Sequence, residues 1–569
     1  MRRFLYMFLF ILFVVSGDVS GQVALVKSTE EKNEGELFIP TIPPEIMNKL
    51  QQPNPVLLFE ECALIAINTS FSVRDAELEL KRRNYGYISE TANLRSKIDL
   101  NMLLPEYTQE TKEDFNDETL VNDYFSVKTN EQNGVMSFTQ PLASNGSLSG
   151  NITVNRFKQE DSDTEYTNRL NVNFIQPLFT ANELQINIYR SKLNLDKSTI
   201  DYVGRRIGLI YGREYFGIRD FGGNFTDFGR LFGGGGGGGG GRDRSGSLSQ
   251  YYYSAYRDTR LFELARDRSE LLQDLVATAQ RRMDEGNLPE SEFLKIRIEA
   301  SGSDDALYSA QSGYNGSKRQ LVQFLGFDAD IDFEVIKEMP YEPITIDHEK
   351  AVALGVENDI GIRNFKIDIE LDSLNIILRR SDLGHSRMRS GGRLNEFSGG
   401  LSASLGVNKT DDIYRLYYDD FNHSQALTLN LAAPVWDWGR SDMVVEAAEV
   451  EYDKKKRQLQ NDILDTERQV LAYLYTFDMI KEQIELIGKA RDSARRGLEI
   501  ARNQFEEGAI SGEDLILAVN RDYQAKREYL RSFIDYKNAL IRLANQTQWD
   551  YENNKGLRTE IEQLIESII

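Results

Sequence analysis

Residues 427–440 read LTLNLAAPVWDWGR, and this stretch contains the change of pattern that decides the fold. Its leucines alternate with Thr428 and Asn430, which is the two-residue period of a β-strand with one apolar face. A proline and two tryptophans follow, and after Gly439 no proline occurs through Phe505. The sequence therefore predicts a strand that leads directly into a helix.

The segment after this strand predicts one very long helix. Apolar residues recur at every seventh position from 463 to 484, and a second heptad series runs from 473 to 501. Two apolar seams indicate a helix that packs on both sides. At about 1.5 Å of rise per residue, a helix from Gly439 to Phe505 would be roughly 100 Å long. We expect a return helix after the glycine turn at Gly508, because glycine readily adopts the left-handed conformation that ends helices.

The same succession of patterns occurs earlier in the chain. Residues 171–184 (NVNFIQPLFTANEL) correspond to 428–441, and residues 283–296 (MDEGNLPESEFLKI) correspond to 505–518. A third pair, 61–76 and 350–365, precedes them in the same order. Three ordered pairs indicate an internal tandem repeat.

The first repeat carries two excess segments. Gly286 follows Pro177 by 109 residues, whereas Gly508 follows Pro434 by 74, so 35 residues are extra. A tract of nine consecutive glycines, 233–241, places this excess in a flexible excursion about 211–250, either a tolerated low-complexity expansion or a tether. The second excess is an acidic segment about 104–134, to which the sequence assigns no role.

Four strands with one apolar and one small polar face are expected, two in each repeat. Leu148 and Val172 belong to the first pair, and Leu405 and Leu429 to the second. Such strands are typical of an outer-membrane barrel, but four cannot close one, so several chains would share it. The alternative is a soluble sandwich that carries an extended coiled coil. We favour the membrane interpretation because the helical hairpins are too long to fold back on a small domain.

The N-terminus and the composition define the compartment. Arg2 and Arg3 precede an apolar run and then small residues, which predicts a secretory signal peptide over 1–21. No other run is long enough for a membrane-spanning helix, so any membrane insertion would use strands. A formal net charge of -22 argues against nucleic acid as a partner. The single cysteine, Cys62, lies in an apolar run and is expected to be buried.

The proline-aromatic junction at residues 434–440 (PVWDWGR), together with the duplicated strand-hairpin and long-helix unit, resembles the TolC-like outer-membrane efflux proteins. This resemblance, to the outer membrane factor family, covers roughly residues 56–551. It implies an α+β membrane protein: a trimeric 12-stranded β-barrel, with four strands per chain, on a long α-helical coiled-coil tunnel in the periplasm.

The resemblance also implies a function and partners. The chain would be the outer-membrane channel subunit of a tripartite efflux or type I secretion system, and a passive conduit for solutes. Its expected partners are two further copies in a homotrimer, outer-membrane lipid, a periplasmic adaptor protein and an inner-membrane pump. The alternative is an exported periplasmic coiled-coil adaptor or scaffold without a pore.

The expected organisation follows from these patterns. Residues 1–21 are the signal peptide, 22–55 an N-terminal extension, 56–330 repeat 1, 331–551 repeat 2 and 552–569 a C-terminal tail. Repeat 1 has its β-hairpin at about 146–176 and its helical hairpin at about 182–326. Repeat 2 has them at about 397–433 and 439–545.

Two groups of candidate functional residues follow from the resemblance. The helical tips that would dock an adaptor comprise Arg282, Met283, Glu285, Gly286 and Glu292 in repeat 1, with Phe505, Glu507, Gly508 and Asp514 in repeat 2. The strand-to-helix junctions comprise Pro177, Phe179, Pro434, Trp436, Trp438 and Gly439. The tyrosine common in the family's tips is replaced by Met283 and Phe505, so a tyrosine latch is not expected. Acidic residues crowd both tips, either as a cation-favouring mouth or simply as solvated helix ends.

Nothing in the sequence predicts an enzyme, a cofactor or a metal site. The three histidines, His348, His385 and His423, are far apart and lack metal-ligand spacing. The glycine tract lacks the lysine and hydroxyl residue of a phosphate-binding loop.

Overall fold

The computed structural model describes residues 44–50, 55–116, 121–160, 162–178, 180–212, 246–327, 333–336, 339–382, 398–411, 422–432 and 438–568. The predicted signal peptide 1–21, most of the extension 22–55 and the glycine tract 233–241 lie outside the described residues. So does His385. Ile42–Ile569 form one compact unit.

Helices make up most of the described chain. They are α2 (Pro44–Leu50), α3 (Phe59–Thr69), α4 (Phe71–Ala92), α5 (Glu183–Tyr211), α6 (Leu248–Asp284), α7 (Glu290–Phe324), α8 (His348–Asn358), α9 (Ile360–Asp382), α10 (Arg440–Glu506), α11 (Gly512–Thr547) and α12 (Leu557–Ile568). None of the described helices is both long and apolar enough to cross a membrane. The longest is α10, and it covers the span predicted for the long helix.

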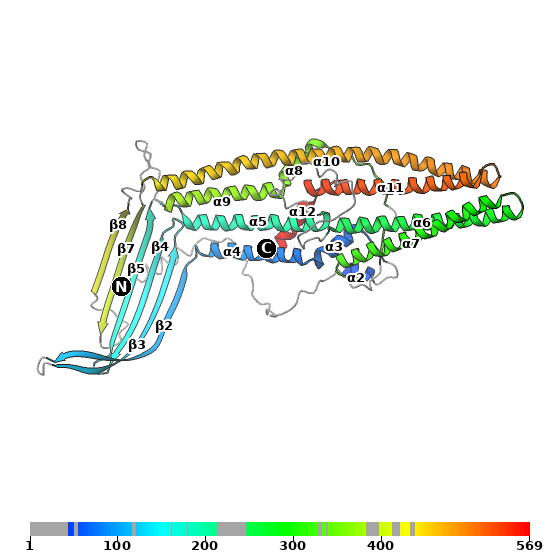
Figure 1. Cartoon of the computed structure of the whole chain (residues 1–569). Coiled ribbons are helices and arrows are strands. Elements are labelled where there is room, and N and C mark those ends of the chain that lie inside the picture. Colours follow the sequence, from blue (N-terminus) through cyan, green and yellow to red (C-terminus); the bar gives the residue numbers. More distant parts are fainter. Residues whose placement is uncertain are drawn as a thin grey trace, which may run out of the picture. The chain divides into compact units, whose positions relative to one another are not determined.

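Four helices lie side by side in the order α4, α5, α9, α10, and each contacts the next (Figure 1). Beyond them α6 pairs with α7, and α10 pairs with α11, as two antiparallel hairpins. On α10 the predicted heptad positions Val470, Phe477 and Ile484 are buried. The heptad series thus places an apolar seam against the neighbouring helices, as the sequence predicts.

The helices on either side of the predicted excursion meet at their ends. Gly212 caps the end of α5 with φ +112°, and a Cβ placed on it would lie 3.6 Å from Oγ of Ser247, the N-cap of α6. The side chain of Asn545 donates a hydrogen bond to the Gly212 carbonyl at 3.0 Å. Residues 213–245, which separate these two helices in the sequence, lie outside the described residues.

All the long strands that the structure describes belong to one antiparallel sheet. They are β2 (Lys97–Asn116), β3 (Val121–Pro141), β4 (Ser147–Gln159), β5 (Glu165–Leu178), β7 (Ser398–Asp411) and β8 (Asn422–Ala432), in the order β2-β3-β4-β5-β7-β8. Two small pairings complete the described strands: β1 (Val56–Leu57) with β6 (Glu334–Val335), and β9 (Trp549–Asp550) with β10 (Lys555–Gly556). The four predicted strands are β4, β5, β7 and β8.

The prediction of four strands per chain is wrong, because β2 and β3 extend the sheet to six. These two strands contain the acidic excess of repeat 1. Only the first part of β2, Ile98 to Met102, alternates apolar and polar residues; the part after Pro105 is charged and polar on both faces. The periodic signal is therefore too short to stand out, and pairing with β3 and β4 decides the structure.

The main helical core lies where the two repeats meet. It joins Cys62 of α3 to Tyr252 of α6, Phe477 of α10 and Tyr536 of α11, all buried. Burial raises the pKa of the Cys62 thiol to about 12. The prediction that Cys62 is buried is confirmed.

Candidate functional site

The sheet has one apolar and one polar face, and both run across its full width. Directly paired residues of antiparallel strands point to the same side, so the strand register defines rows. Three rows form the apolar face, with polar residues at three positions on β3 and β8, Gln140, His423 and Gln425. They are Leu100-Met136-Ile152-Leu170-Val407-His423, Ile98-Phe138-Gly150-Val172-Leu405-Gln425 and Gln140-Leu148-Phe174-Ala403-Leu427.

The opposite face is lined by small polar side chains. Two of its rows are Asp99-Ser137-Asn151-Asn171-Gly406-Ser424 and Thr139-Ser149-Asn173-Ser404-Ala426. Apart from Asp99 on the edge strand β2, the side chains of these rows carry no charge, and serine, threonine and asparagine can each hydrogen-bond to water. This face can therefore line an aqueous space.

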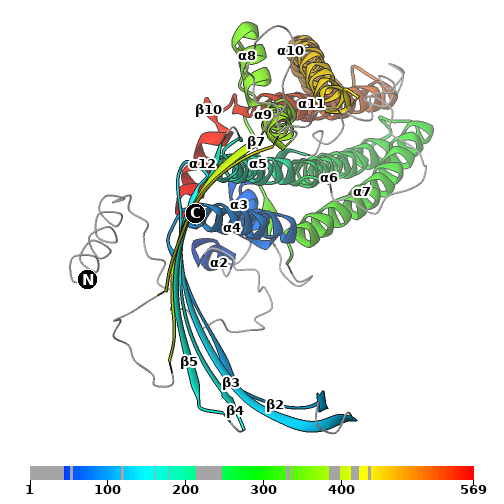
Figure 2. The same cartoon turned by 90° about the vertical axis from the view of Figure 1, so that its left-hand side faces the viewer.

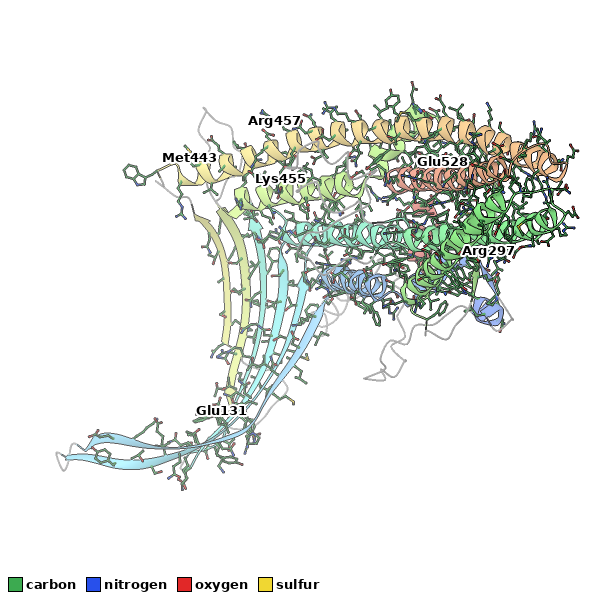
Figure 3. The ribbon with its side chains drawn as sticks, turned by 45° about the vertical axis from the view of Figure 1, so that its right-hand side comes forward. Glu131, Arg297, Met443, Lys455, Arg457 and Glu528 are labelled. Atoms are coloured by element: carbon green, nitrogen blue, oxygen red, sulfur yellow. The ribbon has the colours of Figure 1, made fainter. Side chains whose placement is uncertain are left out.

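The apolar face is not a core, because none of the residues that the structure describes covers it. Leu427 is 75% exposed, Leu429 58% and Met102 73%. Of the four residues that marked the predicted strands, Leu405 is also exposed, and neither Leu148 nor Val172 is buried. Figure 3 shows the side chains of this sheet projecting on both sides without a helix packed over them. An exposed apolar band of this extent marks a surface that meets another apolar phase.

The second candidate region is the pair of helical tips, where α6 turns into α7 and α10 into α11. Gly286 and Gly508 take the left-handed conformation with φ +78° and +77°. In each turn the next residue donates a backbone hydrogen bond of 2.8 Å to the carbonyl four residues before the glycine, Arg282 and Gln504 respectively. This geometry is the Schellman motif, and it explains why both tips require glycine at these positions.

The two tips are fastened to each other. Arg282 donates a hydrogen bond to the backbone carbonyl of Phe505, and its guanidinium lies 4.9 Å from the centre of the Phe505 ring. The Gly512 N–H donates to Glu292 at 3.3 Å, and Lys295 forms an ion pair with Glu513 at 2.7 Å. Phe505 is fully buried between the hairpins, so it contacts the other tip rather than solvent.

The remaining predicted tip residues divide into buried and exposed positions. Met283 is half-buried and packs against the apolar cluster of the tips. Glu285, Glu507 and Asp514 are exposed, as are both turn glycines. Asp514 also completes the capping box of α11 by accepting hydrogen bonds from Ser511. The tips therefore present carboxylates to solvent around a closed apolar contact.

The predicted strand-to-helix junctions are only partly described. Pro177 lies in β5 and pairs with Gly400, and Gly439 is the N-cap of α10 with φ +75°. Trp438 has φ +62° and is 88% exposed. Phe179, Pro434 and Trp436 lie outside the described residues.

Sequence reasoning missed two features that the structure shows. The alternation of Ile98, Leu100 and Met102 is a signal for a further strand, but it is too short to establish one by itself. No pattern could have predicted that Arg282 reaches Phe505, because the contact joins residues 223 positions apart. Among the described residues no group of three or more His, Cys, Asp or Glu side chains is placed to hold a metal ion.

Comparisons with known proteins show which proteins share parts of this sequence and which share its architecture. Residues 396–547 match the family model "Outer membrane efflux protein", and this range includes the second junction and all of α10. A comparison with curated proteins finds no match by sequence. Among solved structures, the chain is similar to the CmeC outer membrane channel of Campylobacter jejuni, with 12% identity, TM-score 0.53 and coverage of 92% of this chain and 94% of that one.

Two further solved structures share the fold. The outer membrane protein VceC of Vibrio cholerae has 13% identity and TM-score 0.52, over 86% of this chain and 95% of that one. CusC, described in terms of transmembrane channel formation, has 10% identity and TM-score 0.54, over 91% of this chain and 98% of that one.

Proposed function

We propose that this chain, whose residues 396–547 match the outer membrane efflux protein family, lies in the outer membrane, extends into the periplasm and is the channel subunit of an export machine. Three copies pool their sheets into one barrel, and their helices continue it as a tunnel. The channel is a passive conduit, and a periplasmic adaptor and an inner-membrane pump, in a tripartite efflux or type I secretion system, supply its solutes.

The exposed apolar band carries this proposal. Lipid is the phase that covers such a band, and the polar rows behind it then face water. A sheet with open edges cannot exist in lipid because its edge N–H and C=O groups would have no partners. Six strands are fewer than the eight of the smallest membrane barrels, so one chain cannot close alone. The number three is what the family resemblance implies.

The tips are the proposed periplasmic opening and the docking surface for the adaptor. The exposed carboxylates Glu285, Glu507 and Asp514 would come close together when three copies converge. A ring of fixed negative charge favours cations and opposes anions. The contact between Arg282 and Phe505 holds the two hairpins of one chain together and so narrows the opening.

The two halves of the chain are proposed to descend from a duplication. Each half contains two strands of the predicted set, a helix that precedes them in the sequence, and a helical hairpin with a glycine in its turn. The matching φ angles of Gly286 and Gly508 support this origin.

Membrane fractionation and conductance test the proposal. The full chain, expressed with its signal sequence, is expected in the outer-membrane fraction and, after purification in detergent, as a trimer by native mass. In planar bilayers it should conduct, with a cation preference that declines in the double variant Glu285→Gln/Glu507→Gln. Asp274→Asn, on the same helix but far from the turn, is the matched control. A water-soluble, non-conducting monomer would instead support the adaptor or scaffold alternative.

A further inference from the structure

We propose that β2 and β3 belong to the membrane-spanning wall and that the free edge of β2 pairs with β8 of a neighbouring copy, so that three copies close an eighteen-stranded barrel. This inference rests on the proposed trimeric channel and deepens it. It assigns an interaction surface, the outer edge of Lys97–Leu103, and a partner, a second copy of this chain. The pore would be wider than one of twelve strands.

The first support is that the apolar band does not stop at β4. Phe138 and Met136 of β3 continue the rows of Gly150 and Ile152, and Ile98 and Leu100 of β2 continue them to the edge. On the other face Asp99, Ser137 and Asn151 continue the polar row. A hairpin that plugged the lumen or lay outside the wall would have no reason to match both faces.

The second support is that the hairpin is fixed at the helix end of the sheet. The turn between β3 and β4 is held by Asn182, whose side chain donates to the Ala143 carbonyl, and by Asn145, which donates to the Ala181 carbonyl at 3.2 Å. Gln140 of β3 accepts from Ser96 and donates to the Leu94 carbonyl, just before β2. These bonds connect β2, β3 and β4 to the ends of α4 and α5.

The third support is the way in which the sheet is joined to the helical layer. α4 leads into β2, β5 into α5, α9 into β7 and β8 into α10. The two outermost strands of the six-stranded sheet are therefore connected to the two outermost helices of the layer, so β2 occupies the edge of the sheet on the side of α4.

The fourth support is the direction of the edge strands. The six strands alternate in direction, so β2 and β8 run antiparallel to each other. A copy placed beside another therefore continues the antiparallel pattern when its β2 meets the neighbour's β8. An even number of strands per chain is what such closure requires.

The far half of the hairpin marks the limit of the membrane band. The pairing of β2 with β3 shifts between Leu103 and Glu106, and beyond this shift the apolar alternation ends. β3 pairs with β4 only as far as Thr129, so the rest of the hairpin extends past the other strands (Figure 2). Its exposed Tyr124 donates a hydrogen bond to Glu113 at 2.9 Å. The charged half thus lies beyond the wall, at the end opposite the helices.

Disulfide cross-linking in native outer membranes tests the edge assignment. In a Cys62→Ser background, a cysteine on β8 (Gln425→Cys or Leu429→Cys) is combined with one on β2 (Ile98→Cys, Leu100→Cys or Met102→Cys). The matched controls combine the same β8 cysteines with one on β4 (Gly150→Cys, Ile152→Cys or Val154→Cys). After mild oxidation, at least one β2 pair should link most of the protein into covalent dimers and trimers, and the β4 pairs should give only background.

The outcomes separate this inference from the proposed function. If the variants are trimeric and conduct, but only β4 pairs or no pairs form covalent multimers, the eighteen-stranded wall is wrong and the channel stands. If the chain is neither trimeric nor conducting, both proposals fail. Pore area gives a second readout, because barrel diameter grows about linearly with strand number. A barrel of eighteen strands should have about twice the conductance of a barrel of twelve strands of the same length.

Discussion

The sheet and the helical tips differ in how far their leucine side chains are exposed. Leu272, on α6 near the tips, is completely buried between the two hairpins, whereas Leu427, on β8, is 75% exposed. Both belong to regular patterns, one with a helical period and one with a period of two. The apolar surface of the tips packs against other helices of the chain, and that of the sheet packs against none of the described helices. At the tips, packing against other helices removes apolar surface from water. At the sheet, the apolar surface can leave water only by contact with an apolar environment outside the chain's described residues.

The largest expected effect comes from placing a charge on the apolar face of the sheet. Leu427→Arg should abolish assembly in the outer membrane, because a lipid-facing arginine near mid-bilayer costs roughly 2–4 kcal/mol and every copy incurs this cost. Thr428→Arg, one residue away on the polar face, should still assemble. Heat-modifiable oligomer bands from outer membranes measure this difference. Equal tolerance of both arginines would mean that lipid does not contact the apolar face.

The second comparison uses one substitution in both regions. Leu272→Ala should lower the free energy of unfolding of the helical hairpins by about 2–5 kcal/mol, because it leaves a cavity in a closed core. Leu429→Ala, in the exposed band, leaves no enclosed cavity and should cost less than half as much. Denaturant unfolding followed by helical circular dichroism provides the values for both variants. Equal losses would show that Leu429 is packed against protein.

The third prediction concerns the link between the tips. Arg282→Ala removes a charge-assisted hydrogen bond and a cation–π contact with Phe505, together worth about 1–3 kcal/mol. Hydrogen exchange of the amides in residues 282–290 and 504–512 should become at least about tenfold faster. Arg281→Ala, next to it on the exposed side, is the control and should leave exchange unchanged. Unchanged exchange in Arg282→Ala would show that the apolar cluster alone holds the tips.

The smallest expected effects distinguish two glycines of the long hairpin. Gly497→Ala should stabilise α10 by about 0.5–1 kcal/mol, since the glycine lies in a helix with nothing within 4 Å of an added Cβ. Gly508→Ala should destabilise the tip by about 1 kcal/mol, because φ +77° strains an alanine and the Cβ would lie 3.0 Å from Arg282. Thermal unfolding of the two variants should shift in opposite directions. Shifts of the same sign would contradict the left-handed turn.

The helices could be predicted further than the sheet because their signals are longer. The heptads of α10 extend over many turns, and the glycine turns repeat in both halves, so the helix positions and the return at Gly508 could be predicted. The number of strands could not be predicted. β2 carries only three alternating apolar residues before Leu103, and its charged half resembles a loop. Its place is fixed by pairing with β3, and thus by residues some 40 positions away.

The local order of the chain can be predicted from its residues: two-faced strands, a proline-aromatic junction, long heptad helices and glycine turns, because each is a periodic or single-residue property. Three further features follow from the folded arrangement: the described sheet has six strands, Arg282 contacts Phe505, and Gly212 at the end of α5 lies beside Ser247 at the start of α6. Those outcomes depend on which distant segments meet. Such meetings are set by hydrogen-bond pairing and packing, which the local sequence does not encode.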